Sequence, residues 1–347
     1  MNQENLPGTA FLAFPEMKNI LVSEFSERFS YGSIKRAATI EGTSFVSSAK
    51  PSWYGDLLYC PDFVPKTDKN GNPILPYWAR TCMLAPKLFS FDSISEAAKL
   101  LSAMQRNWAP YQYQLFRRAS LIQDKLPHIQ LKPRVFPCNI PDTPMGLYTL
   151  TGEKTMIASE KTNSPFAAGK IEFIEDHENP PSRAYLKIQE SLTMFKTFFA
   201  LELPKPGDKC FEAGACPGGW TYVLRLLGAD VFAVDRAELA PKLMSDEHVK
   251  FLAHDAFTLK PEYVESEFGK IDWLFSDVIC YPERLYEWIM MWLESKKARN
   301  IICTIKMQGE TDWNLIEKFS LIENSKIVHL NYNKHELTIL IHNDFAV

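Results

Sequence analysis

Hydrophobic positions follow different patterns in the two halves of the chain. After Gly207, short apolar runs typical of buried strands alternate with stretches of helical periodicity. The expected strands are residues 209–213, 229–234, 249–253, 271–276, 300–305, 326–330 and 336–341, and the expected helices include 281–295 and 311–319. This alternation predicts an α/β fold with a mostly parallel seven-stranded sheet and helices on both faces. Only a few residues join the last two runs, which predicts an antiparallel pair at one edge.

A further helix is expected just before this sheet. Charged residues and two prolines interrupt the chain at 176–181, and Ser182 is of a type that caps helices. The apolar residues that follow are spaced by 3, 4, 3 and 4 positions, which predicts one buried stripe. They are Tyr185, Ile188, Leu192, Phe195 and Phe199. Lys187 lies at the edge of this stripe.

The first half has the mixed pattern of an α+β region. Residues 9–14 are expected to form a strand, and Pro15 fits the first turn of a following helix. Residues 50–76 are rich in Pro, Gly, Asp and Asn and are expected to be irregular loop. Ser93 and Glu96 have the spacing of a capping box, so a helix should begin there. Short extended pieces are expected from residue 132 to 173.

Composition and charge indicate two domains of opposite net charge. The chain has 347 residues, 46 % hydrophobic and 23 % charged, as expected for a globular protein of two domains, which we place at 1–170 and 171–347. Residues 1–170 contain 19 Lys and Arg against 14 Asp and Glu, a net charge of +5. Residues 171–347 contain 19 against 28, a net charge of −9. This asymmetry is a hint that the first half meets a polyanion.

The sequence carries no signal for a membrane, an export route or a metal. No run of 18 or more apolar residues exists, and residues 1–10 lack a basic segment followed by an apolar core. The seven cysteines are odd in number and form no CxxC pair or Cys/His ligand spacing, which favours a reducing compartment. We therefore expect a cytoplasmic monomer that binds no metal and no membrane.

A glycine-rich segment after the first strand of the α/β half is the first candidate for chemistry. It reads Phe-Glu-Ala-Gly-Ala-Cys-Pro-Gly-Gly-Trp over residues 211–220 and opens a helix. Glycines let a ligand approach the backbone, and a helix N-terminus offers free N–H groups. The spacing is not GxGxxG, which disfavours a dehydrogenase, and the Lys-Ser/Thr of a P-loop is missing. A tight turn without a basic residue suits a nucleoside ligand without phosphates.

Acidic residues follow the next strands at positions where they can complete this pocket. Asp235 ends the second strand, where an acid commonly binds a ribose diol. Asp255 follows the third strand and can face the amine of an adenine, and Asp277 follows the fourth. The carboxyl ends of parallel strands meet at one edge, so these groups predict an S-adenosylmethionine pocket. The candidate cofactor-binding residues are Ser182, Gly214, Cys216, Pro217, Gly218, Gly219, Trp220, Asp235, Asp255 and Asp277.

Three segments, residues 216–220, 234–236 and 276–278, resemble the FtsJ-type ribose 2′-O-methyltransferases. Residues 163–169 extend the resemblance to the branch of this family that methylates a cytidine of bacterial large-subunit rRNA. The resemblance implies a Rossmann-like methyltransferase domain preceded by an RNA-binding region with a THUMP-like fold at about 80–170. It also implies a catalytic set of Lys187, Asp277, Lys306 and Glu336. Glu212 either replaces the usual acid of the first strand or is displaced from it by one residue.

The predicted function is therefore S-adenosylmethionine-dependent 2′-O-methylation of an RNA, with cytidine of large-subunit rRNA as the leading substrate. Methyl transfer from a sulfonium requires alignment and removal of the hydroxyl proton. Lys306 is the candidate proton acceptor, a role that it can fill only when neutral. Methylation of tRNA or mRNA remains an alternative, as does a non-catalytic RNA-binding relative.

Bases and aromatic residues alternate at 106–118, a pattern that suits RNA contact. We expect Arg117 and Arg118 at the surface, in contact with RNA, and Trp108 and Tyr111 in the core.

Overall fold

The computed structural model describes residues 3–40, 50–141, 143 and 145–344. The chain divides into two compact units. Unit 1 is Met1–Pro133 with Ile140–Glu172, and unit 2 is Arg134–Asn139 with Phe173–Val347. The short segment Arg134–Asn139 joins unit 2 because Arg134 pairs with Phe173 in an isolated β-bridge and the ring of Phe136 packs edge-on against Phe173. The hydrophobic pattern gave no sign of this exchange.

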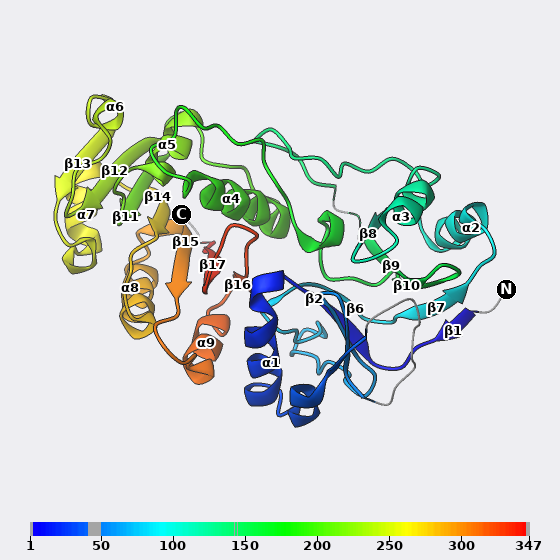
Figure 1. Cartoon of the computed structure of the whole chain (residues 1–347). Helices are drawn as coiled ribbons and strands as arrows, with labels where there is room; N and C mark the ends of the chain where they lie inside the picture. Colours follow the sequence, from blue (N-terminus) through cyan, green and yellow to red (C-terminus); the bar gives the residue numbers. More distant parts are fainter. Residues whose placement is uncertain (1–2, 41–49, 142, 144, 345–347) are drawn as a thin grey trace. The chain divides into compact units, whose positions relative to one another are not determined.

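Unit 2 is built on a seven-stranded sheet with a strand at each of the seven expected runs (Figure 1). The strands are β11 (Lys209–Ala213), β12 (Asp230–Asp235), β13 (Val249–Ala253), β14 (Ile271–Ser276), β15 (Ala298–Lys306), β16 (Ser325–Val328) and β17 (Glu336–His342). Their order is β13-β12-β11-β14-β15-β17-β16. β17 is antiparallel to both of its neighbours, and the pairs from β13 to β15 are all parallel. The expected antiparallel pair at one edge is confirmed.

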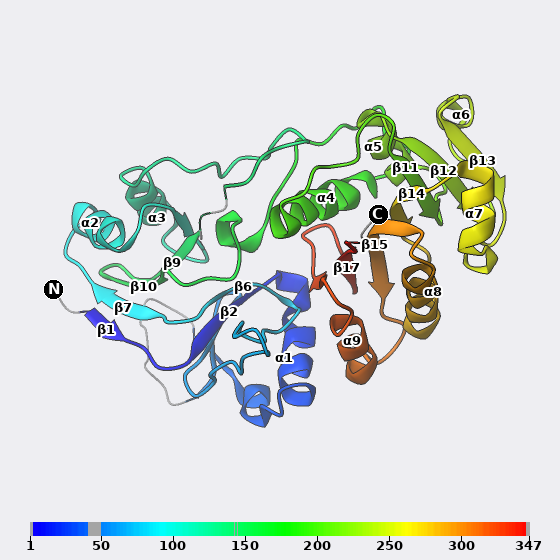
Figure 2. The ribbon, with the colours of Figure 1, turned by 180° about the vertical axis from the view of Figure 1, so that it is seen from behind.

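Helices cover both faces of this sheet, as Figures 1 and 2 show from opposite sides. α4 and α5 lie together on one face, and α7, α8 and α9 lie on the other. The helices of unit 2 are α4 (Tyr185–Phe199), α5 (Gly219–Leu226), α6 (Pro241–Met244), α7 (Pro261–Phe268), α8 (Pro282–Ser295) and α9 (Trp313–Ser320). Aromatic rings fill the space under α8: Phe211 lies with its ring centroid 5.6 Å from that of Phe232 and 5.4 Å from that of Trp292. Burial of such rings is a main source of stability.

The entry into α4 differs from the expected cap. The helix begins at Tyr185, and a turn at 182–184 precedes it, in which the carbonyl oxygen of Ser182 accepts from the N–H of Tyr185. The Ser182 side chain makes no capping hydrogen bond, so that prediction is wrong. The stripe prediction was also too narrow, because Lys187 and Glu190 are buried as well as the apolar residues. Contacts from several sides, rather than periodicity, decide what this helix buries.

Unit 1 contains two five-stranded sheets, with strand orders β1-β7-β10-β9-β8 and β3-β4-β5-β2-β6. The first comprises β1 (Gln3–Asn5), β7 (Lys87–Ser90), β8 (Trp108–Pro110), β9 (Gly146–Gly152) and β10 (Thr155–Ser159). The second comprises β2 (Thr9–Ala13), β3 (Ala38–Thr39), β4 (Ser52–Tyr54), β5 (Leu57–Cys60) and β6 (Ala79–Met83). The helices are α1 (Lys18–Glu27), α2 (Ile94–Met104) and α3 (Phe116–Gln123). Apolar side chains from both sheets share one buried cluster, which ties unit 1 together.

The local predictions for unit 1 had mixed outcomes. The strand and the helix after it are confirmed as β2 and α1, and Ser93 caps α2 by accepting from the N–H of Glu96. The irregular loop at 50–76 is wrong in part, because β4 and β5 form a hairpin there. The turn uses Gly55 at φ 62°, where a Cβ would lie 2.5 Å from the hydroxyl of Tyr111. Buried apolar residues on both sides of the turn outweigh its loop-like composition. Within the described parts of the chain, no helix is long and apolar enough to cross a bilayer.

Candidate active site

Four polar side chains meet at the carboxyl edge of the unit 2 sheet. Lys187 comes from the first turn of α4, Asp277 follows β14, Lys306 ends β15 and Glu336 begins β17. The Nζ of Lys187 lies 3.0 Å from Oδ1 of Asp277 and 2.5 Å from Oε1 of Glu336. The Nζ of Lys306 lies 3.0 Å from the same Oδ1 of Asp277 and donates to its backbone carbonyl at 2.8 Å. The structure thus brings together all four residues of the expected catalytic set, which we call the tetrad.

Strand topology explains why residues 149 positions apart meet here. β14 and β15 are parallel neighbours, so the residues that follow them lie at the same edge. β17 runs the opposite way beside β15, and its register places Glu336 directly opposite Lys306. Lys187 reaches this edge from α4, the helix that packs against β17. A shift of one residue in the β15–β17 register would turn Glu336 to the other face of the sheet.

The side chains of the tetrad are largely withdrawn from solvent. The side chains of Lys187, Asp277, Lys306 and Glu336 are 10 %, 17 %, 18 % and 12 % exposed. Burial lowers the pKa of Lys187, but the carboxylates of Asp277 and Glu336 outweigh burial and raise it. Lys187 therefore keeps its proton, and its charge offsets those of its two acidic partners.

The glycine-rich turn between β11 and α5 lies beside the tetrad and leaves no room for side chains. Gly214 has φ 79°, and a Cβ there would lie 2.5 Å from a methyl group of Val278, the residue after Asp277. Gly218 has φ 108°, which strains any L side chain. A Cβ on Gly219 would lie 2.5 Å from the Oγ of Ser182. The turn therefore presents bare backbone along this side of the edge.

The side-chain hydroxyl of Ser182 lies at this turn. Its Oγ is buried and has no hydrogen-bond partner among the described residues. Buried hydroxyls are nearly always hydrogen-bonded, so an unpaired one beside glycine backbone fits a polar group of a ligand.

Trp220 and Pro217 make hydrogen bonds within the fold instead. The indole N–H of Trp220 donates to the carbonyl of Ala184, and the carbonyl of Pro217 accepts from the N–H of Ala240. Both contacts fix the turn itself.

Asp235 supports the turn from β12. Its Oδ2 accepts from the N–H of Cys216 at 3.0 Å, and its Oδ1 accepts from the N–H of Ala237 at 3.1 Å. Each carboxylate oxygen has a further lone pair, so these contacts leave acceptor capacity for a diol. The side chain therefore shapes the turn and keeps acceptors for a ligand.

Asp255 has a more crowded environment than the sequence suggested. Its Oδ2 accepts from Arg236 and from Arg284, each at 3.1 Å, and its Oδ1 accepts from the N–H of Phe257. Burial raises the pKa of Asp255, but the hydrogen bonds from Arg284 and from the backbone outweigh it and lower the pKa. The spacing of the acids along the sequence gave no indication of either arginine.

Glu212 is buried under the turn. Its carboxylate accepts from the hydroxyl of Thr221 at 2.7 Å, and burial raises its pKa to about 8.

Glu190 is a second buried acid, which the sequence analysis missed. It accepts from the N–H groups of Asn331 and Tyr332, in the loop before β17, and burial raises its pKa to about 8. Its position three residues after Lys187 on a helix was the available signal.

Comparison with known proteins agrees with this geometry. Residues 180–329 match the FtsJ-like methyltransferase family. The chain thus contains an FtsJ-like domain over this range. The chain is also similar to curated proteins named ribosomal RNA large subunit methyltransferase M. It is 36 % identical to the protein of Halorhodospira halophila over 129 residues, which cover 37 % of this chain and 36 % of that protein.

Longer matches have lower identity. The chain is 31 % identical to the protein of that name from Alteromonas mediterranea, over 46 % of each chain. It is 29 % identical to the one from Xanthomonas oryzae pv. oryzae over 257 residues, which cover 71 % of this chain and 69 % of that protein. The chain thus spans between about a third and two thirds of the length of these relatives. The predicted resemblance is confirmed, and Lys187, Asp277 and Lys306 lie within the residues that match the FtsJ-like family.

Proposed function

We propose that this protein is an S-adenosylmethionine-dependent RNA methyltransferase that methylates the ribose 2′-hydroxyl of a cytidine in large-subunit rRNA. The observation that carries the proposal is the tetrad, two lysines and two carboxylates joined within 3.1 Å beside a bare glycine turn. The similarity to the ribosomal RNA large subunit methyltransferases M supports the choice of RNA. An enzyme of rRNA acts where that RNA is, so we place the protein in the cytoplasm.

The residues around the glycine turn fit S-adenosylmethionine. This cofactor supplies a methyl group on a sulfonium, activated for transfer. The bare backbone at Gly214, Gly218 and Gly219 lets a nucleoside lie against the turn, and Asp235 has acceptors left for its ribose. The unpaired hydroxyl of Ser182 suits a polar group of the amino-acid end. Asp255 is held at the edge by two arginines, where it can accept from an adenine amine.

Hydrogen bonding supports different proposed roles for the two lysines. A neutral lysine amine has two N–H groups and one lone pair. Lys306 directs its N–H groups to the carbonyl and the carboxylate of Asp277, which leaves the lone pair for the 2′-hydroxyl proton. Lys187 keeps its proton between Asp277 and Glu336, so it is the fixed charge of the set. Lys306 takes the hydroxyl proton as the bond between the oxygen and the methyl carbon forms. The bond between that carbon and the sulfonium sulfur breaks in the same displacement, and the sulfur leaves as a neutral thioether.

We propose that unit 1 binds RNA and is THUMP-like in its later part. Phe116 is 57 % exposed at the start of α3, and Arg117 beside it is exposed. These two residues and Arg118 line a hollow of about 510 Å³ together with Ile94, Leu115, Leu121 and Glu153. Trp108 and Tyr111 are buried, as expected for core residues. An exposed aromatic ring beside arginines suits an unpaired base and its phosphates.

The test is methyl transfer in vitro followed by mapping. The purified chain is incubated with S-adenosylmethionine and with large-subunit rRNA from cells that lack the gene, and the RNA is digested and analysed by mass spectrometry. The expected product is 2′-O-methylcytidine at one position, which is also missing from the rRNA of those cells. Methylation on a base, or of tRNA only, would contradict the proposal, as would no transfer to any RNA.

A further inference from the structure

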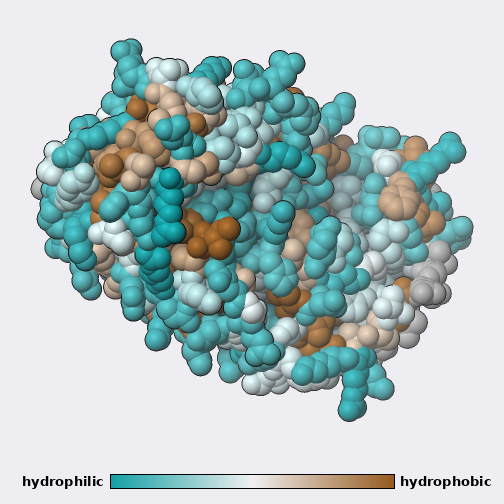
Figure 3. All heavy atoms as spheres, turned by 60° about the vertical axis from the view of Figure 1, so that its left-hand side comes forward, coloured by the Kyte–Doolittle hydropathy of each residue, from teal (hydrophilic) through white to brown (hydrophobic). Residues whose placement is uncertain are grey.

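Large apolar side chains are exposed directly after Asp277. Ile279 is 78 % exposed and Tyr281 is 65 % exposed, whereas Cys280 between them is buried. Hydrophobic areas of this kind stand out on a largely hydrophilic surface, as the face in Figure 3 shows. Single exposed apolar residues are ordinary, but two within four positions of a tetrad residue require a reason.

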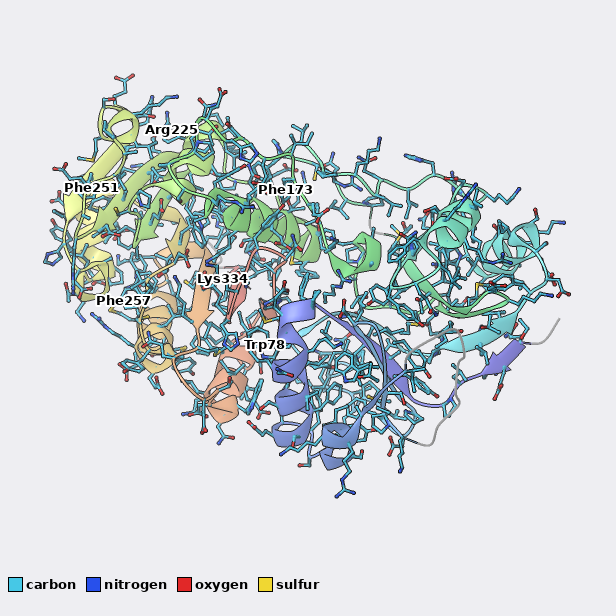
Figure 4. All side chains as sticks on the ribbon, in the orientation of Figure 1. Trp78, Phe173, Arg225, Phe251, Phe257 and Lys334 are labelled. Carbon is cyan, nitrogen blue, oxygen red and sulfur yellow. The ribbon has the colours of Figure 1, made fainter. Side chains whose placement is uncertain are left out.

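An arginine on the same helical turn is held rigidly beside them. The guanidinium of Arg284 donates to Asp255 at 3.1 Å and lies 5.3 Å from the ring centroid of Phe257. Phe257, labelled in Figure 4, stacks on Trp288 of α8 with ring centroids 4.6 Å apart. Arg236 donates to the same oxygen of Asp255. The two arginines share this one carboxylate, and their side chains are 49 % and 80 % exposed.

Tyr281 and Arg284 lie close to the tetrad. Tyr281 lines a hollow of about 50 Å³ with Met307 and Gln308, which follow Lys306 in the chain. Burial raises the pKa of the Cys280 thiol to about 11, while the charges of Arg284 and Lys306 both lower it.

The spacing of the two residues favours a single ligand. Tyr281 is the N-cap of α8 and Arg284 lies three positions on, about one helical turn away. Tyr281 lies beside the residues that follow β15, and Arg284 lies beside Asp255. Glu283 and Glu310 line the small hollow and would repel a phosphate. Arg284 is therefore the residue on this turn that can bind a phosphate. Proteins commonly bind an unpaired nucleotide with an aromatic ring and an arginine: the base stacks on the ring, and the phosphate pairs with the guanidinium.

We propose that Tyr281 and Arg284 form a binding site for a nucleotide of single-stranded RNA adjacent to the one that is methylated. The Tyr281 ring stacks on its base, and Arg284, supported by Arg236, pairs with its phosphate. This inference rests on the proposed function, because it takes the tetrad as the place where the target ribose lies. Stacking tolerates any base, so the site holds the strand in place and does not select its sequence.

The test measures RNA binding separately from catalysis. The full chain is titrated against a fluorescein-labelled oligocytidylate 12-mer by anisotropy, at several salt concentrations and with S-adenosylmethionine present. Tyr281→Ala is expected to weaken binding by roughly 5- to 150-fold, the range for loss of one stacked base. Tyr281→Phe keeps the ring and should bind as the unsubstituted chain does. Arg284→Ala should weaken binding and reduce the slope of log affinity against log salt by about 0.7.

Matched controls lie at the opposite edge of the sheet. Leu321→Ala removes an apolar residue that is 77 % exposed, and Arg299→Ala removes an exposed arginine at the start of β15. Both should bind the oligonucleotide normally. Calorimetric titration with S-adenosylmethionine, together with circular dichroism, should give the same cofactor affinity and the same folding for Tyr281→Ala and Tyr281→Phe. Arg284→Lys, which keeps a charge beside Asp255, serves if Arg284→Ala is unstable.

The outcomes separate this inference from the proposed function. Unchanged binding by Tyr281→Ala and Arg284→Ala would overturn the inference, even if the chain methylates RNA. So would equal losses in Tyr281→Phe and Tyr281→Ala, equal affinity for a 12-bp RNA duplex, or no binding of the oligonucleotide by the unsubstituted chain. A chain that binds as expected but transfers no methyl group would contradict the proposed function and leave this site standing.

Discussion

Each unit of the chain buries a carboxylate together with a basic partner, but the two environments differ in what they leave open. In unit 1, Glu24 is fully buried and accepts from the N–H groups of Tyr77 and Trp78 and from the guanidinium of Arg28. In unit 2, Asp277 receives two lysines at the edge of a sheet, beside backbone without side chains. Glu24 has all its partners within the fold. The tetrad lies at a sheet edge beside glycine backbone, so position rather than burial marks the site.

The largest expected effect is at Lys306. Lys306→Ala should reduce the rate of methyl transfer by roughly 10²- to 10⁴-fold, the usual contribution of a general base, and leave cofactor binding nearly unchanged. Lys306→Arg should be almost as damaging because a guanidinium stays protonated. Single-turnover methylation at saturating cofactor measures both. Near-normal turnover by Lys306→Arg would show that the residue only holds charge.

Glu24→Ala should have the opposite profile. It leaves Arg28 and two backbone N–H groups without their acceptor, so unfolding should cost about 3–5 kcal/mol less. Chemical denaturation measures this loss, and methyl transfer by the remaining folded protein should be normal. A stable Glu24→Ala variant with impaired methyl transfer would contradict the view that Glu24 serves stability while Asp277 serves the site.

Asp235→Ala should weaken binding of S-adenosylmethionine by roughly 10- to 150-fold, because it removes a charged acceptor from the ribose and from the N–H of Cys216. Calorimetric titration gives the affinity. Circular dichroism should report a folded domain, since the side chain lies at a strand end. Unchanged affinity would exclude Asp235 from the cofactor pocket.

Replacing Arg117 and Arg118 together by Ala should weaken RNA binding by several-fold and leave cofactor affinity unchanged. Each lost phosphate contact should lower the salt slope by about 0.7 for single-stranded RNA. Anisotropy titrations against large-subunit rRNA fragments at several salt concentrations measure this. An equal effect of the exposed pair Lys99→Ala and Lys125→Ala would mean that only overall charge matters.

The smallest effect is expected at Ser182. Ser182→Ala removes a buried hydroxyl that has no partner within the fold, so stability should stay the same or rise. Cofactor affinity should fall by about fivefold, the value of one hydrogen bond of about 1 kcal/mol. Lower stability together with normal affinity would mean that the hydroxyl serves the fold and not a ligand.

The sequence by itself determined most of unit 2. Apolar runs of strand length placed all seven strands to within a few residues, because a buried parallel sheet requires continuous hydrophobic runs. It also indicated which residues follow those strands, and the carboxyl ends of parallel strands share one edge. Unit 1 was less predictable. Its strands are short, and the β4–β5 hairpin lies in a stretch with the composition of a loop. The hairpin forms because its residues are buried and because β5 also pairs with β2, which is distant in sequence.

Only the tertiary structure decided the contacts on which the chemistry depends. The β15–β17 register sets Glu336 opposite Lys306, and α4 brings Lys187 to both acids. The pairing of Asp255 with Arg236 and Arg284, and the support that Glu190 gives to the loop before β17, join residues 19 to 142 positions apart. Periodicity reports which face of an element is buried, whereas a hydrogen bond depends on distances of a few tenths of an ångström. Those distances arise when separate elements pack together, and no local pattern encodes them.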